Sequence, residues 1–521
     1  MALTKFHSFA KDNGGRVSLL LLLFLLAIYE FISAGFNAFA IVCALPIIVL
    51  VVLAAFHYGM LTFWALVCVN YFLQWHSITL PSGIPMSMYN EMFEIILIAL
   101  AIIDVKEAKF KRTANLMLYA LLIWCGYCSL QVLNDTCGIG IDVGGWYTAA
   151  RMMAFQLMYA FLVYILYITN PKILIKYLYV WGILALIATY WVWRQKNIGF
   201  TPAENAWLQT RGRTTHILQG GSLIRYFSVY SDAANFGIGI ASTAVAYIIF
   251  GITSKIKKHK IYFLIVGFAS AWAMFPSGTR TAMACLIAGF MAYIFLSKSF
   301  KIAIPFTLIF GFLAFLLVFT TIGNSNQQIR RMRSTFDKND ASANVRAINQ
   351  EAMKKYMKEA PWGIGMGIGN TGKKTVPANN KYTFMATVPP DSEYVFIWIH
   401  TGVIGITTFL ICTAIMLIGA CWIVFFTLKS PSLRGIGAGF CCAFVSQQLG
   451  GYGNQVLMQY PNCLVFYGGL SIVYVLPWIE NEWIAYENEQ LAIQEEKKRL
   501  KLEKKKQSRV KGIFNWISNW I

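Results

Sequence analysis

Basic and acidic side chains in this sequence gather in a few polar stretches between long apolar segments. The first stretch, residues 194–232, has many basic residues and few acidic ones. Its cationic side chains are Arg194, Lys196, Arg211, Arg213 and Arg225. Outside a membrane, short loops are poor in Lys and Arg, so an excess there predicts a site for an anion. The alternative is that a strong flanking topology simply tolerates these charges.

A second arginine stands in the tight turn PSGTRTA, at residues 276–282, between two apolar segments. A guanidinium so close to hydrocarbon is costly unless it is paired or hydrated. We therefore expect Arg280 to face a polar cavity. The alternative is that its side chain extends to lipid headgroup phosphates.

The longest polar stretch, residues 323–391, combines a basic run, an amphipathic helix and a glycine-rich segment. The basic run consists of Arg330, Arg331 and Arg333. The helix is predicted from about Asn344 and ends before Pro361. The segment PWGIGMGIGN follows, with glycines at 363, 365, 367 and 369. No strand precedes it, so it is not a dinucleotide fingerprint; its glycines permit close backbone approach or unusual dihedral angles.

Two carboxylates, Asp391 and Glu393, stand where the next apolar helix begins. The helix dipole favours negative charge there, and capping is the simple explanation for Asp391 and Ser392. Glu393 lies further toward the bilayer, where a carboxylate suits a general base. His400 could share the face of Glu393, although a packed histidine is more common within a helix.

The elements that must position these groups are transmembrane helices. Hydrophobic residues make up 57% of the 521 residues and charged residues 13%, against about 25% charged in soluble domains. Because unpaired backbone groups are too costly in hydrocarbon, the sequence predicts an all-α, polytopic helix bundle. About fourteen spans are expected, with 12–14 plausible, at residues 17–33, 38–56, 57–75, 88–103, 114–133, 152–168, 177–193, 233–252, 261–275, 282–296, 302–322, 394–426, 435–449 and 464–478.

Lysine-rich short loops set the expected orientation. They contain Lys106, Lys109, Lys111 and Arg112, then Lys255, Lys257, Lys258 and Lys260, then Lys298, Lys301, Lys429 and Arg434. All fall on one side, which the positive-inside rule makes cytoplasmic. We expect a transmembrane domain at 1–479, an external loop at 323–391 with short helices, and a basic cytoplasmic tail at 480–521. Both termini are then cytoplasmic, and anionic lipid headgroups, not nucleic acid, balance the net charge of +21.

Four segments, in this order, resemble the O-antigen ligase and O-antigen polymerase (Wzy-type) membrane proteins. They are RYFSVYSDAANFG (225–237), SGTRTAMACLIAG (277–289), NVRAINQEAMKKYMKEAPWGIGMGIG (344–369) and DSEYVFIWIHTGVIGI (391–406). The resemblance implies glycosyl transfer at the outer face of the bacterial cytoplasmic membrane, from an oligosaccharide on undecaprenyl diphosphate. It implies no metal, cofactor or nucleotide sugar. Implied partners are membrane lipid and the chain-length regulator and flippase proteins of the same process.

The resemblance also implies roles for residues. Arg225 and Arg280 would bind the diphosphate, with Arg346 as a third candidate. Diphosphate is a competent leaving group, so the remaining tasks are charge neutralisation by guanidinium groups and deprotonation of an acceptor hydroxyl by Glu393 or Asp391. The predicted substrate-loop residues are Arg211, Arg213, His216, Arg330, Arg331, Arg333, Gly363 and Gly365.

One departure from the family pattern favours a polymerase. Ligases carry a histidine near the start of the helix after the large loop, where this chain has Asp391-Ser392-Glu393. The alternatives are a ligase that uses a carboxylate or His216, and a flippase or other transporter of lipid-linked oligosaccharide. Transporters tend to show internal repeats and paired broken helices, and neither stands out in this sequence.

Overall fold

The computed structural model describes residues 58–78, 86–103, 110–218, 223–297, 341–369, 375–388 and 390–518, with isolated positions between 18 and 29 and between 304 and 330. The chain forms two compact units, Met1–Ala65 and Leu66–Ile521. The second unit holds every predicted site residue. The predicted spans at 17–33, 38–56 and 302–322 lie outside the described residues, apart from isolated positions.

Helices dominate the described residues. They are α4 (Gly59–Phe72), α5 (Met86–Ile103), α6 (Leu116–Leu130), α7 (Val143–Ala150), α8 (Gln156–Tyr167), α9 (Pro171–Asn197), α10 (Pro202–Thr210), α11 (Arg213–His216), α12 (Ala233–Thr253), α13 (Lys257–Ala273), α14 (Arg280–Leu296), α17 (Ala341–Met357), α18 (Thr383–Thr387), α19 (Glu393–Trp422), α20 (Pro431–Gly453) and α21 (Gly468–Ser518). π-helical turns connect α7 to α8 (Arg151–Phe155), extend α19 (Ile423–Thr427) and lead into α21 (Cys463–Tyr467).

The all-α membrane class is confirmed. By length and composition, seven helical stretches of the described chain could cross a membrane. They are Leu116–Leu133, Val143–Tyr167, Pro171–Asn197, Ala233–Thr253, Lys257–Ser277, Glu393–Thr427 and Cys463–Lys501. The count of fourteen and the external position of residues 323–391 stay predictions.

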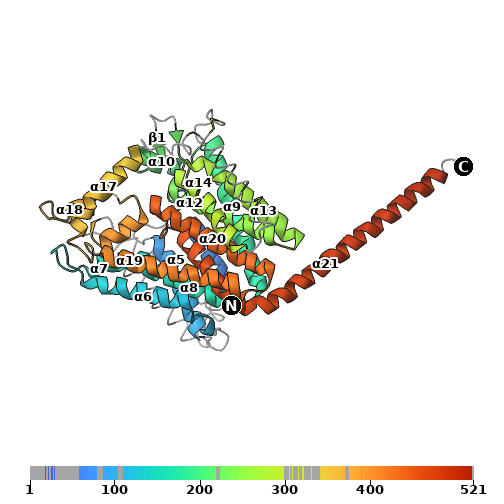
Figure 1. Cartoon of the computed structure of the whole chain (residues 1–521), viewed down its shortest axis with the longest axis horizontal. Helices are drawn as coiled ribbons and strands as arrows, with labels where there is room; N and C mark the ends of the chain where they lie inside the picture. The colour runs from blue at the N-terminus through green and yellow to red at the C-terminus, as the bar shows by residue number, and fades with distance from the viewer. Residues whose placement is uncertain are drawn as a thin grey trace, which may run out of the picture. The chain divides into compact units, whose positions relative to one another are not determined.

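Helix α12 packs against α13, α14 and α20 (Figure 1). Almost all of its side chains are buried. Small residues allow this close packing: a Cβ at Gly237 would collide with Ser277, and one at Gly239 with Asn462. Helix α12 thereby holds the turn before α14 and the segment before α21 at fixed places.

The two ends of this bundle differ in chemistry. At the lysine end, where α12 finishes and α20 begins, Lys255 pairs with Glu487 of α21 at 2.9 Å. Glu480 accepts hydrogen bonds there from the backbone N–H groups of Lys429 and Ser430. At the opposite end, here named the site end, α12, α14 and α19 begin. The 21 residues of α12 separate the two ends by about 30 Å, at about 1.5 Å per residue.

The polar stretch 194–232 contains more structure than the sequence predicted. Helices α10 and α11 are followed by two short antiparallel strands, β1 (Ile217–Leu218) and β2 (Leu223–Ile224), with Ile217 opposite Ile224. A capping box between Thr201 and Glu204 starts α10. This compact segment places Arg225 directly after β2.

Helix α21 continues without interruption from Gly468 to Ser518. The basic tail predicted at 480–521 is therefore helical up to Ser518. The predicted domain boundary at residue 479 falls inside this helix, and the division into two domains stays a prediction.

Candidate functional site

Arg225 is bound to the turn that precedes α14. Its backbone N–H donates to the His216 carbonyl at 2.9 Å. Its half-buried guanidinium donates from Nε to the Ser277 carbonyl (3.3 Å), from Nη1 to the Thr215 carbonyl (3.0 Å) and from Nη2 to Thr279 Oγ1 (3.0 Å). These hydrogen bonds fix the direction of the guanidinium plane at the site end of the bundle.

Thr279 joins Arg225 to Arg280. Its hydroxyl accepts from Arg225 and donates to the carbonyl of Ala233, the first residue of α12, at 2.7 Å. The next residue, Arg280, is half-buried and is the first residue of α14. The structure thus brings the two predicted diphosphate-binding residues to one turn, although 54 residues separate Arg225 from Thr279 in sequence.

His216 has a structural use that the sequence did not reveal. Its ring is buried between Trp207 and Phe227. Nε2 accepts from the backbone N–H of Ala233 at 3.0 Å, and Nδ1 lies 2.8 Å from Thr215 Oγ1. Burial, followed by the positive charge of Arg225, lowers the pKa of His216 to about 4. A neutral His216 therefore caps α12 together with the carboxylate of Asp232, which accepts from the next two N–H groups.

Three of the remaining predicted arginines are on the surface. Arg211 and Arg213, at the start of α11, are exposed, and Arg330 is exposed and helical. Arg346 lies in α17, but its side chain is outside the described structure, as are Arg331 and Arg333.

Gly363 and Gly365 are predicted substrate-loop residues. An exposed loop would favour contact with substrate, but neither glycine lies on one. Both are buried, with φ of +80° and +100°, against a break in α19 at Gly402, where φ is +73°. The break frees backbone groups of α19, and the glycine segment satisfies them: Ile364 N–H donates to the Ile399 carbonyl at 2.9 Å and Gly365 N–H to the His400 carbonyl at 3.2 Å. His400 Nδ1 lies 3.1 Å from the Gly365 carbonyl, so this histidine is packed and satisfied.

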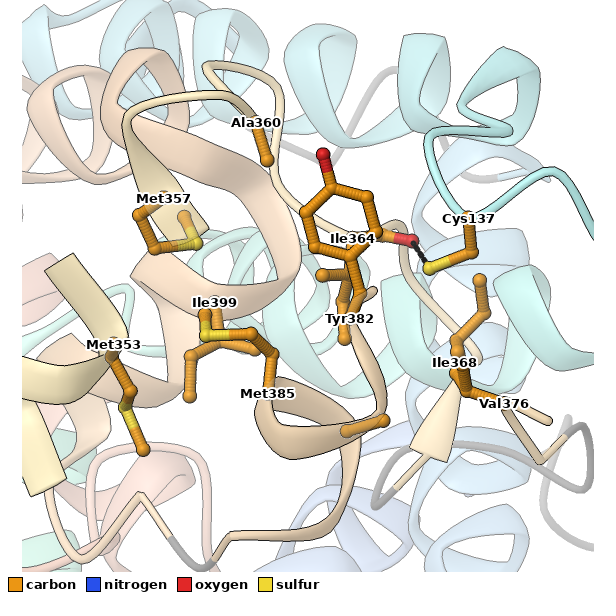
Figure 2. Packing of buried hydrophobic residues seen from close by; sticks show 11 residues of the cluster. Cys137, Met353, Met357, Ala360, Ile364, Ile368, Val376, Tyr382, Met385 and Ile399 are labelled. Carbon is orange, nitrogen blue, oxygen red and sulfur yellow. Dashed lines mark hydrogen bonds between the residues drawn. The ribbon is translucent and has the colours of Figure 1, made fainter. Parts of the chain in front are cut away.

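The glycine segment belongs to a small apolar core of its own (Figure 2). Met353 and Met357 from α17 and Met385 from α18 pack there with Ile364 and with Ile399 of α19. The Cys137 thiol contacts the Ile364 carbonyl at 3.5 Å, as Figure 2 shows. This core holds the described part of the loop against the first half of α19, the helix that begins with Glu393.

Glu393 is buried and lines a cavity of about 420 Å³. Its Oε2 accepts from the Leu457 N–H at 3.0 Å, and the N–H groups of Val456 and Met458 also interact with the carboxylate. Asp391 is exposed and has a φ of +54°. Ser392 does not cap α19 with its side chain, because its hydroxyl donates to the Gly451 carbonyl at 3.2 Å.

The cavity has polar and apolar walls. Its lining residues are Thr148, Ala149, Met152, Met153, Pro390, Glu393, Phe396, Gln455, Met458 and Gln459. Carboxamides such as those of Gln455 and Gln459 both donate and accept hydrogen bonds, as sugar hydroxyls require. An amphiphilic cavity beside a carboxylate suits a sugar next to a lipid chain.

The segment 454–460, which follows α20, links the carboxylate to the arginines; we call it the bridge loop. Asn454 Nδ2 donates to the hydroxyl of Thr281, the neighbour of Arg280, at 3.2 Å. Gln459 Oε1 accepts from Ser231 Oγ, just before α12, at 2.5 Å. Since Leu457 holds Glu393, this loop contacts all three functional segments. Sequence reasoning missed it, because its residues carry no charge.

A further signal in the sequence is a pair of acidic residues within an apolar segment. Glu91 and Glu94 fall within a predicted span, where ionisable residues are rare and functional. The structure pairs Glu91 with Arg151 at 3.1 Å and places Glu94 against Gln156. Within the described residues there is no group of three or more His, Cys, Asp or Glu side chains that could hold a metal ion.

The fold and site define a polytopic helical membrane protein with cationic and carboxylate groups at one end of its bundle. Residues 264–410 match the family described as O-antigen ligase. This match covers less than a third of the chain and confirms the resemblance for that part; members of the family are membrane glycosyltransferase-like enzymes. The family match and the membrane helices together fit a bacterial inner-membrane protein. None of the curated proteins searched matches the chain.

Proposed function

We propose that this protein is a polysaccharide polymerase. It transfers an oligosaccharide repeat unit from a polyprenyl diphosphate carrier to a hydroxyl of another repeat unit, on the outer side of the cytoplasmic membrane. The observation that carries the proposal is the convergence of Arg225 and Arg280 on one turn, joined through the bridge loop to the buried carboxylate of Glu393.

The arginine turn supplies the diphosphate site. Guanidinium groups match phosphate oxygens in charge and geometry, and the positive end of α14 adds to the potential there. The hydrogen bonds of Arg225 to Thr215, Ser277 and Thr279 orient it in advance, which lowers the cost of organising the site during reaction.

Glu393 is the proposed general base, and it is preferred over Asp391 because it lines the cavity. The acceptor sugar would occupy the cavity, with its hydroxyl directed at Glu393. As this oxygen forms a bond to the anomeric carbon of the donor, its proton passes to the carboxylate. The bond between the anomeric carbon and the phosphate oxygen breaks, and its electron pair leaves with the lipid diphosphate.

The distribution of lysines supports the proposed orientation. Lys255 and Lys429 lie at the lysine end of the bundle, which the positive-inside rule favours as cytoplasmic. The arginine turn and Glu393 lie at the opposite end. The proposed chemistry would therefore occur on the outer side, where the lipid-linked repeat units are displayed.

Replacement of Arg280 tests the proposal. Arg280→Ala should reduce polymer formation by about 100-fold or more, the scale of losing one preorganised charge contact in a transition state, while the protein still accumulates in membranes. Arg280→Lys should retain part of the activity, and Arg499→Ala, on the exposed part of α21, is the matched control. Full activity of Arg280→Ala would end the assignment.

A ligase is the second candidate, because the matched family is described as O-antigen ligase. The polysaccharide pattern in cells that lack the protein separates the two. Loss of a polymerase leaves single repeat units attached to their acceptor, whereas loss of a ligase leaves none. Release of the free lipid diphosphate, when purified protein is incubated with a lipid-linked donor, would exclude a transporter. Only an enzyme breaks the bond between the glycan and the diphosphate.

A further inference from the structure

A second polar network lies behind the cavity, between α5 and α8. Its central residues are Glu94, Gln156 and Tyr460, and all three are almost completely buried. Gln156 Nε2 lies 2.7 and 2.8 Å from the two carboxylate oxygens of Glu94. The Tyr460 hydroxyl donates to Gln156 Oε1 at 2.9 Å. Buried carboxylates within a span are costly, so a packing role alone does not explain Glu94.

A π-helical turn makes this network possible. Arg151 contacts Glu91, and Gln156, five residues later, contacts Glu94, three residues after Glu91. In a regular α-helix, residues five apart would point about 140° away from each other. The π-helical turn Arg151–Phe155 brings residues five apart to one face. The same turn presents Met152 and Met153 to the cavity.

The network fixes the direction of each hydrogen bond. The NH₂ group of Gln156 faces Glu94 and donates to both of its carboxyl oxygens. The carbonyl oxygen of Gln156 must then face Tyr460, whose hydroxyl becomes the donor. Tyr460 is also held at its carbonyl, which accepts from Asn235 Nδ2 of α12 at 2.8 Å. The hydroxyl and the backbone carbonyl of Tyr460 are therefore both held by residues outside the bridge loop.

Tyr460 in turn sets the wall of the cavity. It is the last residue of the bridge loop and follows Gln459, which lines the cavity, as do Met458 and Gln455. Leu457, three residues earlier, holds Glu393. A shift of Tyr460 would thus move both the carboxamides that face the cavity and the amide that holds the carboxylate.

We propose that Glu94, Gln156 and Tyr460 are positioning residues for the acceptor sugar, and that they act through the bridge loop. This inference rests on the proposed polymerase function for the identity of the ligand. The positioning role depends only on the contacts of the bridge loop. The positioning role and the polymerase function can therefore be refuted separately.

The test compares Tyr460→Phe with Tyr177→Phe in full-length protein in lipid nanodiscs. Tyr177 is the matched control, because its hydroxyl accepts a buried hydrogen bond from Tyr164 at 3.3 Å, outside the network. With a lipid-linked oligosaccharide as donor and acceptor, Tyr460→Phe should raise the acceptor KM about tenfold and change kcat less than about twofold, as expected when binding in ground and transition states weakens equally. Tyr177→Phe should leave both constants unchanged.

Two further measurements keep the outcomes distinct. Hydrogen exchange of the bridge-loop amides should become about tenfold faster in Tyr460→Phe but not in Tyr177→Phe. The double variant Glu94→Gln with Tyr460→Phe should be no worse than Tyr460→Phe alone, because both changes break one chain. Unchanged exchange and KM, or additive effects, would overturn the positioning role. Faster exchange in a protein that never turns over the donor would support positioning and refute the polymerase.

Discussion

Gly363 offers the sharpest test of how the broken helix α19 is held. We consider Gly363→Ala, which adds one methyl group at a residue with φ of +80°. The new Cβ would lie 2.5 Å from the backbone atoms Gly402 N, His400 C and Thr401 N. These are main-chain atoms of α19, so no rotation of a side chain relieves the contact. The glycine segment must move away from the break.

Two other glycines separate backbone strain from overpacking as contributions to the expected loss of stability. Gly138 has φ of +64° with open space around its Cβ position, so Gly138→Ala should cost only the left-handed strain, about 1–2 kcal/mol. Gly363→Ala should cost that strain plus about 1–3 kcal/mol for overpacking, or about 2–5 kcal/mol together. Gly126→Ala, in open space within α6, should stabilise by up to about 1 kcal/mol through helix propensity.

The free energy of unfolding, from SDS titration of the purified protein in mixed micelles, checks this order. Gly363→Ala must lose clearly more stability than Gly138→Ala, with Gly126→Ala at or above the wild type. Equal losses of stability in Gly363→Ala and Gly138→Ala would mean that the glycine segment does not pack closely against the break in α19. The packing of the loop on α19 would then be wrong.

Two further predictions concern the arginine turn. Because the pKa of His216 is lowered to about 4 from about 6.5 in the unfolded chain, the unfolded chain takes up a proton between these values that the folded chain does not. Stability should therefore fall as the pH falls from 6.5 to 4, by about 3 kcal/mol from this group. His216→Gln keeps an acceptor for Ala233 and should flatten that part of the decline in thermal melts; identical pH profiles would contradict the capping role. Thr279→Val loses the hydroxyl between Ala233 and Arg225 and should raise the donor KM about tenfold, while Thr279→Ser stays near the wild type; an unchanged KM in Thr279→Val would remove Thr279 as the link.

Local patterns in the sequence predicted the helices well. The apolar runs predict membrane helices because their cause, the cost of bare backbone in hydrocarbon, acts within each segment. The amphipathic helix before Pro361 is confirmed as α17, and the position of Glu393 at the start of α19 is confirmed. Each of these features depends on residues within a few turns of each other.

The features that the sequence did not predict depend on distant partners. The sequence near Gly363 does not indicate that α19 is broken at Gly402, which is 39 positions away. It also does not indicate that the backbone groups freed by this break accept hydrogen bonds from the glycine segment. The capping role of His216 could not be predicted, because its partner, the first N–H of α12, is 17 residues away. The bridge loop is uncharged, so only the structure shows that it contacts Thr281, Glu393 and Ser231.

The way Glu393 is held explains how a base can operate close to an anion site. A bidentate pair with arginine would occupy both oxygens of a carboxylate. A backbone amide, such as that of Leu457, stabilises the negative charge while lone pairs remain to accept a proton. The start of α19 adds a favourable dipole at the same place. The bridge loop thus holds the Glu393 carboxylate through backbone amides and leaves the guanidinium groups to the diphosphate, which requires their charge.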